Sequence, residues 1–273
     1  MPADSLTIAI VTYHPDPEPF VAVLRQLRVA QTVLRNDAGI ASTLVILDNG
    51  GQHAQILALV RQAGLGGQPE VQVRDTGGNP GYGRAHNQAI VAAATPYHLI
   101  LNPDVLVADD ALLRGVRWLQ QHPEVAAISP AAVDAEGQPA YLCKRYPALV
   151  DLLLRGFAPR GLQRRFQARL DRYKYRAVID AGEPAEVDLI SGCFMLCRGG
   201  ALRAVGGFDP RYFLYFEDFS LSLALRAQGS LQYLPTCRIR HFGGDAGRKG
   251  WRHVLYFLRS ALRFYGQHGW KWI

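Results

Sequence analysis

The sequence predicts an α/β fold in which a mainly parallel central sheet is flanked by helices, with amphipathic helices near its C-terminal end. Short β-branched apolar runs alternate with amphipathic helical patterns over the first hundred residues, an arrangement typical of parallel strands joined by crossover helices. The chain has 273 residues, of which 49% are hydrophobic and 19% charged. It can therefore bury a sizeable core in one or two domains.

Each strand expected in this region ends in a polar loop that contains Gly or Pro. The strands span residues 6–13, 43–47, 71–74 and 97–101, and helices are expected up to residue 34 and over 84–94. Because the carboxyl ends of parallel strands meet at one edge of a sheet, these loops should converge on one ligand-binding crevice. Beyond residue 143 the pattern is less regular, and we expect that part to complete the same sheet.

Charge is distributed unevenly along the chain. The net charge of +7 combines −5 over residues 1–143, +8 over 144–176, −3 over 177–237 and +7 over 238–273. Two local basic surfaces on an acidic body argue against a nucleic-acid partner. The four cysteines form no CxxC pair, which suits a reducing cytosol, and we expect neither a signal peptide nor a membrane-spanning run.

Candidate ligand-binding residues stand in the loops after the strands. Asp48 could hydrogen-bond a ribose or base edge, or simply cap its turn. The glycine-rich stretch 79–87 feeds a helix, so its backbone could approach an anion or form an ordinary turn. Asp104 follows the fourth strand, where a carboxylate could bind a hard cation together with substrate phosphates; solvation is the simpler alternative.

The second half contributes carboxylates and a histidine. Glu217 and Asp218 follow a dense aromatic run, an unusual place for ionised groups unless they are paired or functional. One could act as a general base, and both would also favour a helix N-terminus. His241 precedes a basic loop with Arg248 and Lys249. These residues could join a metal site and clamp a diphosphate, or be structural and solvated.

Together these motifs resemble the inverting glycosyltransferases of family two, which have the Rossmann-like GT-A nucleotide-sugar-binding fold. The resemblance covers nearly the whole chain. Its most specific part combines the Gly-Gly-Phe-Asp of residues 206–209, the aromatic run 213–216 and the Glu-Asp of 217–218. Within the family the chain is most similar to bacterial rhamnosyltransferases of surface-polysaccharide synthesis, whose donor is dTDP-rhamnose.

The resemblance implies a GT-A catalytic domain over residues 1–240. It divides this domain into a nucleotide-binding half, 1–105, and an acceptor-binding half, 106–240. A C-terminal basic loop and helix, 241–273, would pack on the domain. The implied nucleotide-sugar-binding residues are Thr12, Tyr13, Asp48, Asn79, Gly81, Asn87, Asn102, Asp104, Arg248 and Lys249.

The resemblance also assigns chemistry. Asp218 would be the catalytic base, Asp104 and His241 would hold Mg²⁺ or Mn²⁺, and Gly192 and Glu217 would face the acceptor. The family's DxD motif begins here with Asn102 in place of an aspartate, so the site has one negative charge fewer and its dependence on metal is left open. A second departure is the stretch 245–247, Asp-Ala-Gly, where a loop with Ser is more usual.

The implied reaction moves a sugar from a nucleotide diphosphate to a hydroxyl of a glycan or lipid-linked glycan, with one inversion at the anomeric carbon. A sugar nucleotidyltransferase is an alternative, but it would place a glycine-rich basic loop directly after the first strand, where this chain has residues 12–15, Thr-Tyr-His-Pro. A non-catalytic nucleotide-sugar binder is disfavoured by the retention of Asp104, Asp218 and His241.

Two basic segments suggest a membrane partner. Apolar side chains recur at helical spacing beside arginines, at Leu162, Phe166, Leu170 and Tyr173 and at Trp251, Val254, Leu255, Leu258 and Leu262. Such helices suit an anionic membrane surface, although their apolar faces could equally pack on the catalytic body. We therefore expect a cytoplasmic protein that is peripheral on the cytoplasmic face of the inner membrane.

Overall fold

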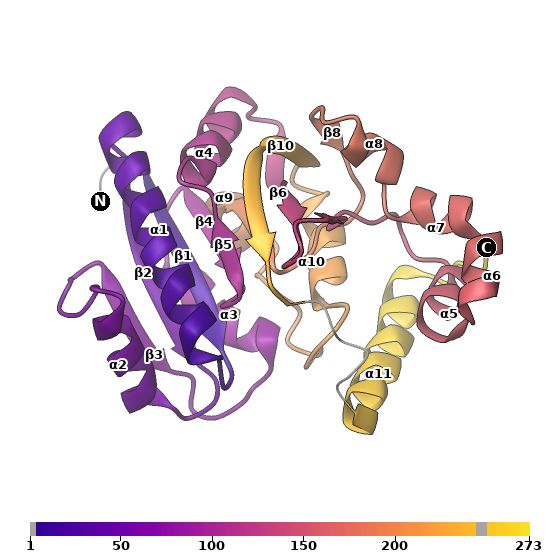
Figure 1. The fold of residues 1–273 in the computed structure, drawn as a ribbon, viewed down its shortest axis with the longest axis horizontal. Helices are drawn as coiled ribbons and strands as arrows, with labels where there is room; N and C mark the ends of the chain where they lie inside the picture. The colour runs from indigo at the N-terminus through magenta and orange to yellow at the C-terminus, as the bar shows by residue number, and fades with distance from the viewer. Residues whose placement is uncertain (1–3, 244–249) are drawn as a thin grey trace.

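The computed structural model describes residues 4–243 and 250–273, in which one sheet runs through the centre of the molecule (Figure 1). Its main strand order is β3-β2-β1-β4-β9-β6-β10-β5, with β7 beside β6 and β8 beside β10. The strands are β1 (Ser5–Thr12), β2 (Ala41–Asp48), β3 (Val71–Asp75), β4 (Tyr97–Leu101), β5 (Val105–Val107), β6 (Val125–Val133), β7 (Pro139–Ala140), β8 (Ala185–Glu186), β9 (Phe194–Arg198) and β10 (Ser230–His241). The helices are α1 (Pro17–Ala38), α2 (His53–Gln62), α3 (Tyr82–Ala92), α4 (Ala111–Gln121), α5 (Leu149–Phe157), α6 (Arg160–Arg165), α7 (Gln167–Tyr173), α8 (Arg176–Asp180), α9 (Gly199–Ala204), α10 (Glu217–Leu225) and α11 (Gly250–His268).

The first four strands pair in parallel, as the alternation of strands and helices predicts. Strand β1 is buried along its whole length because both faces of the sheet are covered. Ile8 and Ile10 belong to the core shared with α1 and α4, whereas Ala9 and Val11 belong to the core on the other face, under α3. Residues of opposite parity thus meet helices on opposite faces, which explains the continuous apolar run.

The second half completes the same sheet. Strand β9 inserts antiparallel between β4 and β6, β10 runs parallel to β6, and β5 lies antiparallel on β10. This confirms the expected α/β fold with one central sheet and shows that its later half is mixed. The pairing of β5 with β10 sets His241 opposite Val105, which places the histidine next to Asp104.

Helices α5 to α8 and α11 form a group beside the sheet, on the right of Figure 1. The helical spacing expected around residues 162–173 is interrupted at Phe166, which separates α6 from α7. Leu170 and Tyr173 on α7 are buried, but Leu162 and Phe166 are exposed. The apolar face predicted for this segment therefore packs on the body only in its second part.

Helix α11 packs on the body through a different face from the apolar stripe read in the sequence. Ala261, Phe264 and Tyr265 are buried, and they form a core with the aromatic segment before α10. The stripe itself is solvent-exposed, with relative exposures of 46% to 69%, at Trp251, Val254, Leu255, Leu258 and Leu262. Packing on the catalytic body thus does not account for this stripe. None of the described helices combines the length and apolar character needed to cross a membrane.

Candidate active site

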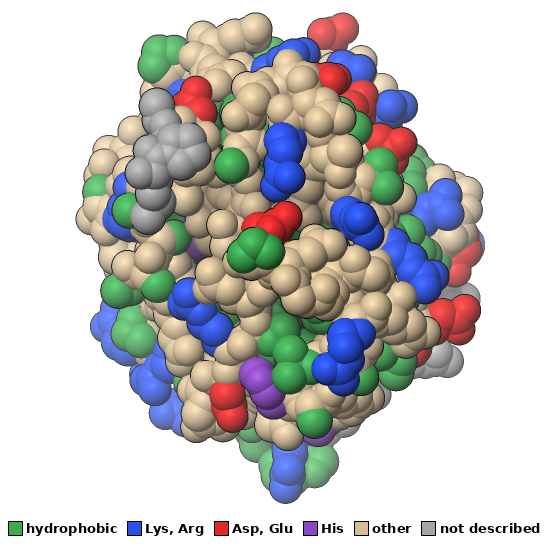
Figure 2. Space-filling view, turned by 90° about the vertical axis from the view of Figure 1, so that its left-hand side faces the viewer, with side chains coloured by type: hydrophobic (Ala, Val, Ile, Leu, Met, Phe, Trp, Pro, Cys, Tyr) green, Lys and Arg blue, Asp and Glu red, His purple; other side chains and the backbone are tan. Residues whose placement is uncertain are grey.

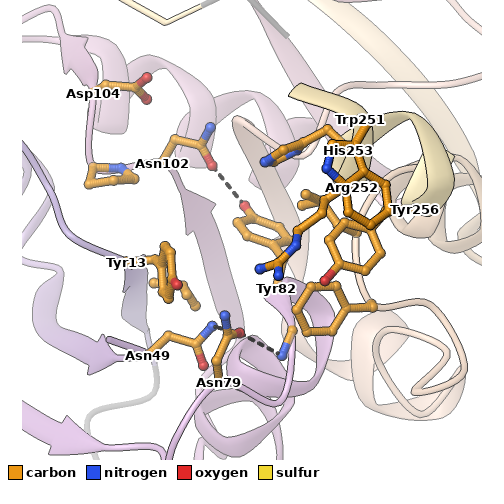
Figure 3. A pocket seen from close by; sticks show the side chains of 15 residues that line it. Tyr13, Asn49, Asn79, Tyr82, Asn102, Asp104, Trp251, Arg252, His253 and Tyr256 are labelled. Carbon is orange, nitrogen blue, oxygen red and sulfur yellow. Dashed lines mark hydrogen bonds between the residues drawn. The ribbon is translucent and has the colours of Figure 1, made fainter. Parts of the chain in front are cut away.

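The first cavity, of about 700 Å³, opens at the carboxyl ends of β1, β2 and β4. Figure 3 shows side chains from the strand-end loops on one side and side chains of α11 facing them across the hollow. The loops contribute Tyr13, Asn49, Asn79, Asn102 and Asp104, and α11 contributes Trp251, Arg252, His253 and Tyr256. These strand-end loops therefore converge on one crevice at this edge of the sheet, as their positions in the sequence predict.

Amide side chains fix the floor of the first cavity. Asn79 Oδ1 accepts hydrogen bonds from Asn49 Nδ2 at 2.8 Å and from the Gly81 backbone N–H at 3.1 Å. Gly81 has φ +100°, and a Cβ there would lie 2.6 Å from the carbonyl oxygen of Phe213. Only glycine fits this close approach, so the start of α3 is held against the aromatic segment that precedes α10.

Three of the expected nucleotide-binding residues do not line this cavity. Thr12 is fully buried and donates to the Leu47 carbonyl at 3.3 Å. Asp48 is also buried; its Oδ1 accepts from the Gly50 N–H at 3.0 Å, while its Oδ2 has no hydrogen-bond partner within the described residues. Asn87 pairs with the backbone of Phe208 and so braces the turn at the Gly-Gly-Phe-Asp motif.

Asp104 and His241 meet at the border of the first cavity. His241 Nε2 lies 3.4 Å from Asp104 Oδ1, and this oxygen is buried with no hydrogen-bond partner in the described part of the chain. A Cβ on Gly243 would lie 2.0 Å from Asp104 Oδ2, so a side chain there would collide with the carboxylate. An unpaired carboxylate oxygen facing an imidazole fits Mg²⁺ or Mn²⁺. Groups of three or more candidate ligands are absent from the described ranges, so a substrate would have to supply further ligands.

A second cavity, of about 460 Å³, lies beside the first. His241 lines it, and its partner Asp104 lines the first, so this pair stands where the two cavities meet. Other lining residues are Lys144, Arg155, Tyr173, Ser191, Glu217 and Asp218. Eight of the predicted site residues therefore line two adjoining hollows: Tyr13, Asn79, Gly81, Asn102, Asp104, Glu217, Asp218 and His241.

A strained turn presents the acid pair to the second cavity. Tyr215 and Phe216 both have left-handed backbone conformations, with φ +69° and +63°, and α10 begins directly after them. Left-handed conformations are costly for bulky residues and persist where the surroundings impose them. Helix α11 supplies these surroundings, because Phe216 packs on Phe257 and the Tyr215 hydroxyl hydrogen-bonds His253 Nδ1 at 2.9 Å.

The two acids of the pair have different partners. Asp218 accepts hydrogen bonds from the backbone N–H groups of Gly192, at 3.0 Å, and Phe219, at 2.9 Å. Glu217 Oε2 is buried without a partner among the described residues. Burial raises the pKa of both carboxyl groups, that of Glu217 to about 8 with a contribution from the charge of Asp218. Because the amides stabilise a carboxylate, Asp218 carries the negative charge and Glu217 holds the proton at neutral pH.

The sequence did not single out Tyr82, which connects the two halves of the site. Its hydroxyl lies 2.7 Å from the Gly192 carbonyl oxygen and 3.0 Å from Asn102 Oδ1 (Figure 3). Burial raises its pKa well above the usual value, and nearby Cys193, Glu217, Asp218 and Asp104 raise it further, which shows that these groups converge. An aromatic residue directly after the loop glycine was the available signal.

Other residues of the first cavity were also missed. Arg252, His253 and Tyr256 face the strand-end loops from α11 (Figure 3). Arg252 is one of the arginines beside the apolar positions of the C-terminal helix, and its position three residues after Lys249 was the signal for a role in binding an anion. Arg248 and Lys249 themselves lie outside the described residues.

Comparison with known proteins identifies the family. Residues 2–252 match the family described as "Glycosyltransferase like family 2". This chain belongs to glycosyltransferase family 2. It is 30% identical over 286 residues to the N-acetylglucosaminyl-diphospho-decaprenol L-rhamnosyltransferase of Mycobacterium tuberculosis, covering 96% of this chain and 84% of that protein. It is 26% identical over 199 residues to Rhamnosyltransferase WbbL of Escherichia coli K12, covering 69% and 71%.

Solved structures confirm the GT-A fold of this glycosyltransferase. GalNAc-T7 with UDP, GalNAc and Mn²⁺ superposes with a TM-score of 0.65 at 14% identity, covering 97% of this chain and 48% of that one. The mannosyltransferase PcManGT of Pyrobaculum calidifontis with GDP-Man and Mn²⁺ gives 0.59 at 18% identity, covering 94% and 64%. The family and the curated relatives favour a glycosyltransferase over a nucleotidyltransferase or a non-catalytic binder.

Proposed function

We propose that this glycosyltransferase transfers rhamnose from dTDP-rhamnose, with inversion, to a hydroxyl of a glycan or lipid-linked glycan. The observation that carries the proposal is the junction of the two cavities. Asp104 and His241 stand at the border, and the ionised Asp218 lies in the second cavity. A donor in the first cavity and an acceptor in the second would meet there. The choice of rhamnose is supported by the names of the two relatives.

The first cavity suits a nucleotide diphosphate sugar. Its exposed Tyr13 ring offers an apolar face to a base, and Arg252 offers a positive charge to phosphate.

Asp104 and His241 would hold a divalent cation, Mg²⁺ or Mn²⁺, together with oxygens of the donor diphosphate. When bound, such an ion would stabilise the negative charge that develops on the leaving diphosphate. Asn102 cannot supply the charge of an aspartate, and its Oδ1 lies 3.0 Å from the Tyr82 hydroxyl. The amide thus positions Tyr82 in the wall of the first cavity.

Asp218 would accept the proton of the acceptor hydroxyl. As that oxygen bonds to the anomeric carbon, the bond from this carbon to the diphosphate oxygen breaks, and the diphosphate leaves with the electron pair. Attack from the face opposite the leaving group gives one inversion. Hydrogen bonds from Gly192 and Phe219 keep Asp218 ionised and fix the direction of its carboxylate, while the protonated Glu217 adds no second charge.

The exposed stripe of α11 supports an acceptor carried on a membrane, and we propose that the protein is a cytoplasmic, membrane-peripheral enzyme. The stripe consists of Val254, Leu255, Leu258 and Leu262 together with Trp251, which also borders the first cavity. Exposed Arg259 lies beside the stripe, as does Arg252 at the cavity end. An apolar stripe flanked by arginines suits an anionic lipid surface. Figure 2 shows a contrasting flank, the side of α1 and α2, where basic, acidic and hydrophobic side chains are interspersed.

Thermal stabilisation by nucleotide sugars tests the donor. The melting temperature of the protein is measured with dTDP-rhamnose, dTDP-glucose, UDP-glucose and GDP-mannose, each with and without Mn²⁺. We expect the largest shift with dTDP-rhamnose and Mn²⁺, and a smaller one in Arg252→Gln, whose side chain lines the first cavity. A larger shift with a uridine or guanosine sugar would overturn the proposed donor.

A further inference from the structure

The wall of the second cavity carries cationic and hydroxyl groups that the transfer step leaves without a role. Lys144 precedes α5, Arg155 lies on α5, and Tyr173 ends α7. All three line the cavity that also contains Asp218. Proton removal from a neutral sugar hydroxyl needs none of them.

Lys144 is fixed in place by its backbone. Its N–H donates to the Leu189 carbonyl at 2.9 Å, and its carbonyl accepts from the Leu189 N–H at 3.0 Å. Its Nζ donates only to the neutral carbonyl oxygens of Tyr141 and Cys143, and it forms no ion pair within the described residues. Burial and the charge of Arg155 lower the pKa of Lys144 to about 7. An ammonium group crowded by another cation would gain from an anion.

Arg155 and Tyr173 add a guanidinium group and a hydroxyl group to the same wall of the second cavity. Arg155 forms no ion pair with the described residues, whereas Arg169 on α7 pairs with Asp151 at 2.5 Å. Tyr173 is 2% exposed, and its hydroxyl has no hydrogen-bond partner in the described part of the chain. Burial raises the pKa of Tyr173, so the hydroxyl keeps its proton and can donate it. A buried donor without a partner is costly unless a ligand accepts its hydrogen.

We propose that Lys144, Arg155 and Tyr173 form a phosphate subsite for the acceptor, so that the acceptor is a sugar attached to a phosphate or diphosphate rather than a neutral glycan. This rests on the proposed glycosyl transfer. Phosphate oxygens accept several charge-assisted hydrogen bonds at once, which matches an ammonium, a guanidinium and a hydroxyl on one wall. The sugar of such an acceptor would extend from this wall toward Asp218.

The second cavity also has an apolar part. Leu152 of α5 and Phe257 of α11 line the cavity together with the three donors. Phe257 lies on α11 next to Leu258 of the exposed stripe. A lipid joined to the phosphate could therefore pass from the cavity to the surface that we propose to meet the membrane.

Binding of two acceptor analogues, without donor, tests the subsite. One is N-acetylglucosamine joined through a diphosphate to a short alkyl chain, and the other is the neutral alkyl glycoside of the same sugar. Calorimetry should show that the wild-type protein binds the diphosphate analogue at least about tenfold more tightly. Arg155→Gln and Tyr173→Phe should reduce this preference by about tenfold and severalfold, and Lys144→Arg should keep most of it. Arg61→Gln on α2, far along the sheet, is the matched control and should change nothing.

Equal affinity of the wild-type protein for the two analogues would overturn the subsite, as would equal losses for both analogues in Arg155→Gln. Inorganic pyrophosphate distinguishes the sources of phosphate: the subsite requires that it compete with the diphosphate analogue even when dTDP fills the donor cavity. If only dTDP displaced bound pyrophosphate, the phosphate contacts would belong to the donor cavity instead. Transfer of rhamnose is a separate readout, so a preference for the diphosphate analogue without transfer would leave the subsite standing and reject the donor.

Discussion

The two cavities are built from different chemistry. In the first, neutral amides satisfy one another, as when Asn49 donates to Asn79, and the loop geometry is fixed before any ligand arrives. In the second, Glu217 Oε2 and the Tyr173 hydroxyl are buried without partners among the described residues, and Lys144 has no counter-ion there. The first cavity is thus a preorganised platform, whereas Glu217, Tyr173 and Lys144 in the second would find the partners that they lack in a substrate.

Helix α11 contacts both cavities and so fixes their positions relative to each other. His253 lines the first cavity and hydrogen-bonds Tyr215, and Phe257 lines the second cavity and packs on Phe216. The same helix therefore shapes the first cavity and stabilises the left-handed turn that aims the acid pair. Apart from Trp251, which also lines the first cavity, the exposed stripe lies clear of both cavities, so attachment there would leave both contacts intact.

Removing the negative charge of Asp218 from the second cavity, with the first cavity unchanged, should have the largest effect on turnover. Asp218→Asn keeps the shape of the side chain but cannot accept the proton of the acceptor hydroxyl, so we expect turnover to fall by about 10²- to 10⁴-fold. Nucleotide binding, measured by calorimetry, should be unchanged because the first cavity is intact. Turnover close to that of the wild-type protein would reject Asp218 as the base. The matched variant Glu217→Gln should retain more activity, since Glu217 is already protonated at neutral pH.

Removing the divalent cation should lower sugar transfer at the border between the cavities, where Asp104 and His241 lie. We expect excess EDTA to lower transfer by about a hundredfold, because the leaving diphosphate loses its charge stabilisation, and Mn²⁺ to restore it. Asp104→Asn should weaken the stabilisation that Mn²⁺ adds to nucleotide binding. The thermal shift by metal-free dTDP serves as the control and should change little. Full activity in EDTA would instead show that the charge on the diphosphate is balanced by side chains alone.

The contrast between the cavities also explains what the sequence could predict. The strand-end loops follow from local apolar periodicity, which is why Asn79, Asn102 and Asp104 could be assigned to one crevice. Tyr82 and Arg252 have only weak local signals in the sequence, because their roles depend on contacts between distant segments. Likewise, contacts with α11 impose the left-handed turn before Glu217. The helix break at Phe166 is also invisible in the sequence, because the apolar residues keep their helical spacing across it. The proximity of His241 to Asp104 was implied by family resemblance, and its physical cause is the register of β10 on β5.

The exposed stripe of α11 predicts attachment to anionic vesicles. In co-sedimentation at low salt, we expect binding to vesicles with anionic lipid and little binding to neutral ones. A double change, Leu255→Gln and Leu258→Gln, should weaken binding by about tenfold because apolar surface no longer enters the interface. Both side chains are exposed, so the fold and nucleotide binding should be preserved. Wild-type protein that ignores anionic vesicles would leave the stripe without a membrane role.

An effect on stability rather than on activity isolates the protonated member of the acid pair. Because burial raises the pKa of Glu217 from 4.5 to about 8, the folded protein keeps a proton that the unfolded chain releases in this interval. The free energy of unfolding should therefore decrease as pH rises from about 4.5 to about 8. Glu217→Gln has no proton to lose, so its denaturant midpoint should fall less over this range than that of the wild-type protein. The exposed Glu183→Gln is the control and should follow the wild-type protein. Parallel curves for Glu217→Gln and the wild-type protein would mean that Glu217 is ionised in the fold, and the second cavity would then hold two negative charges in place of one.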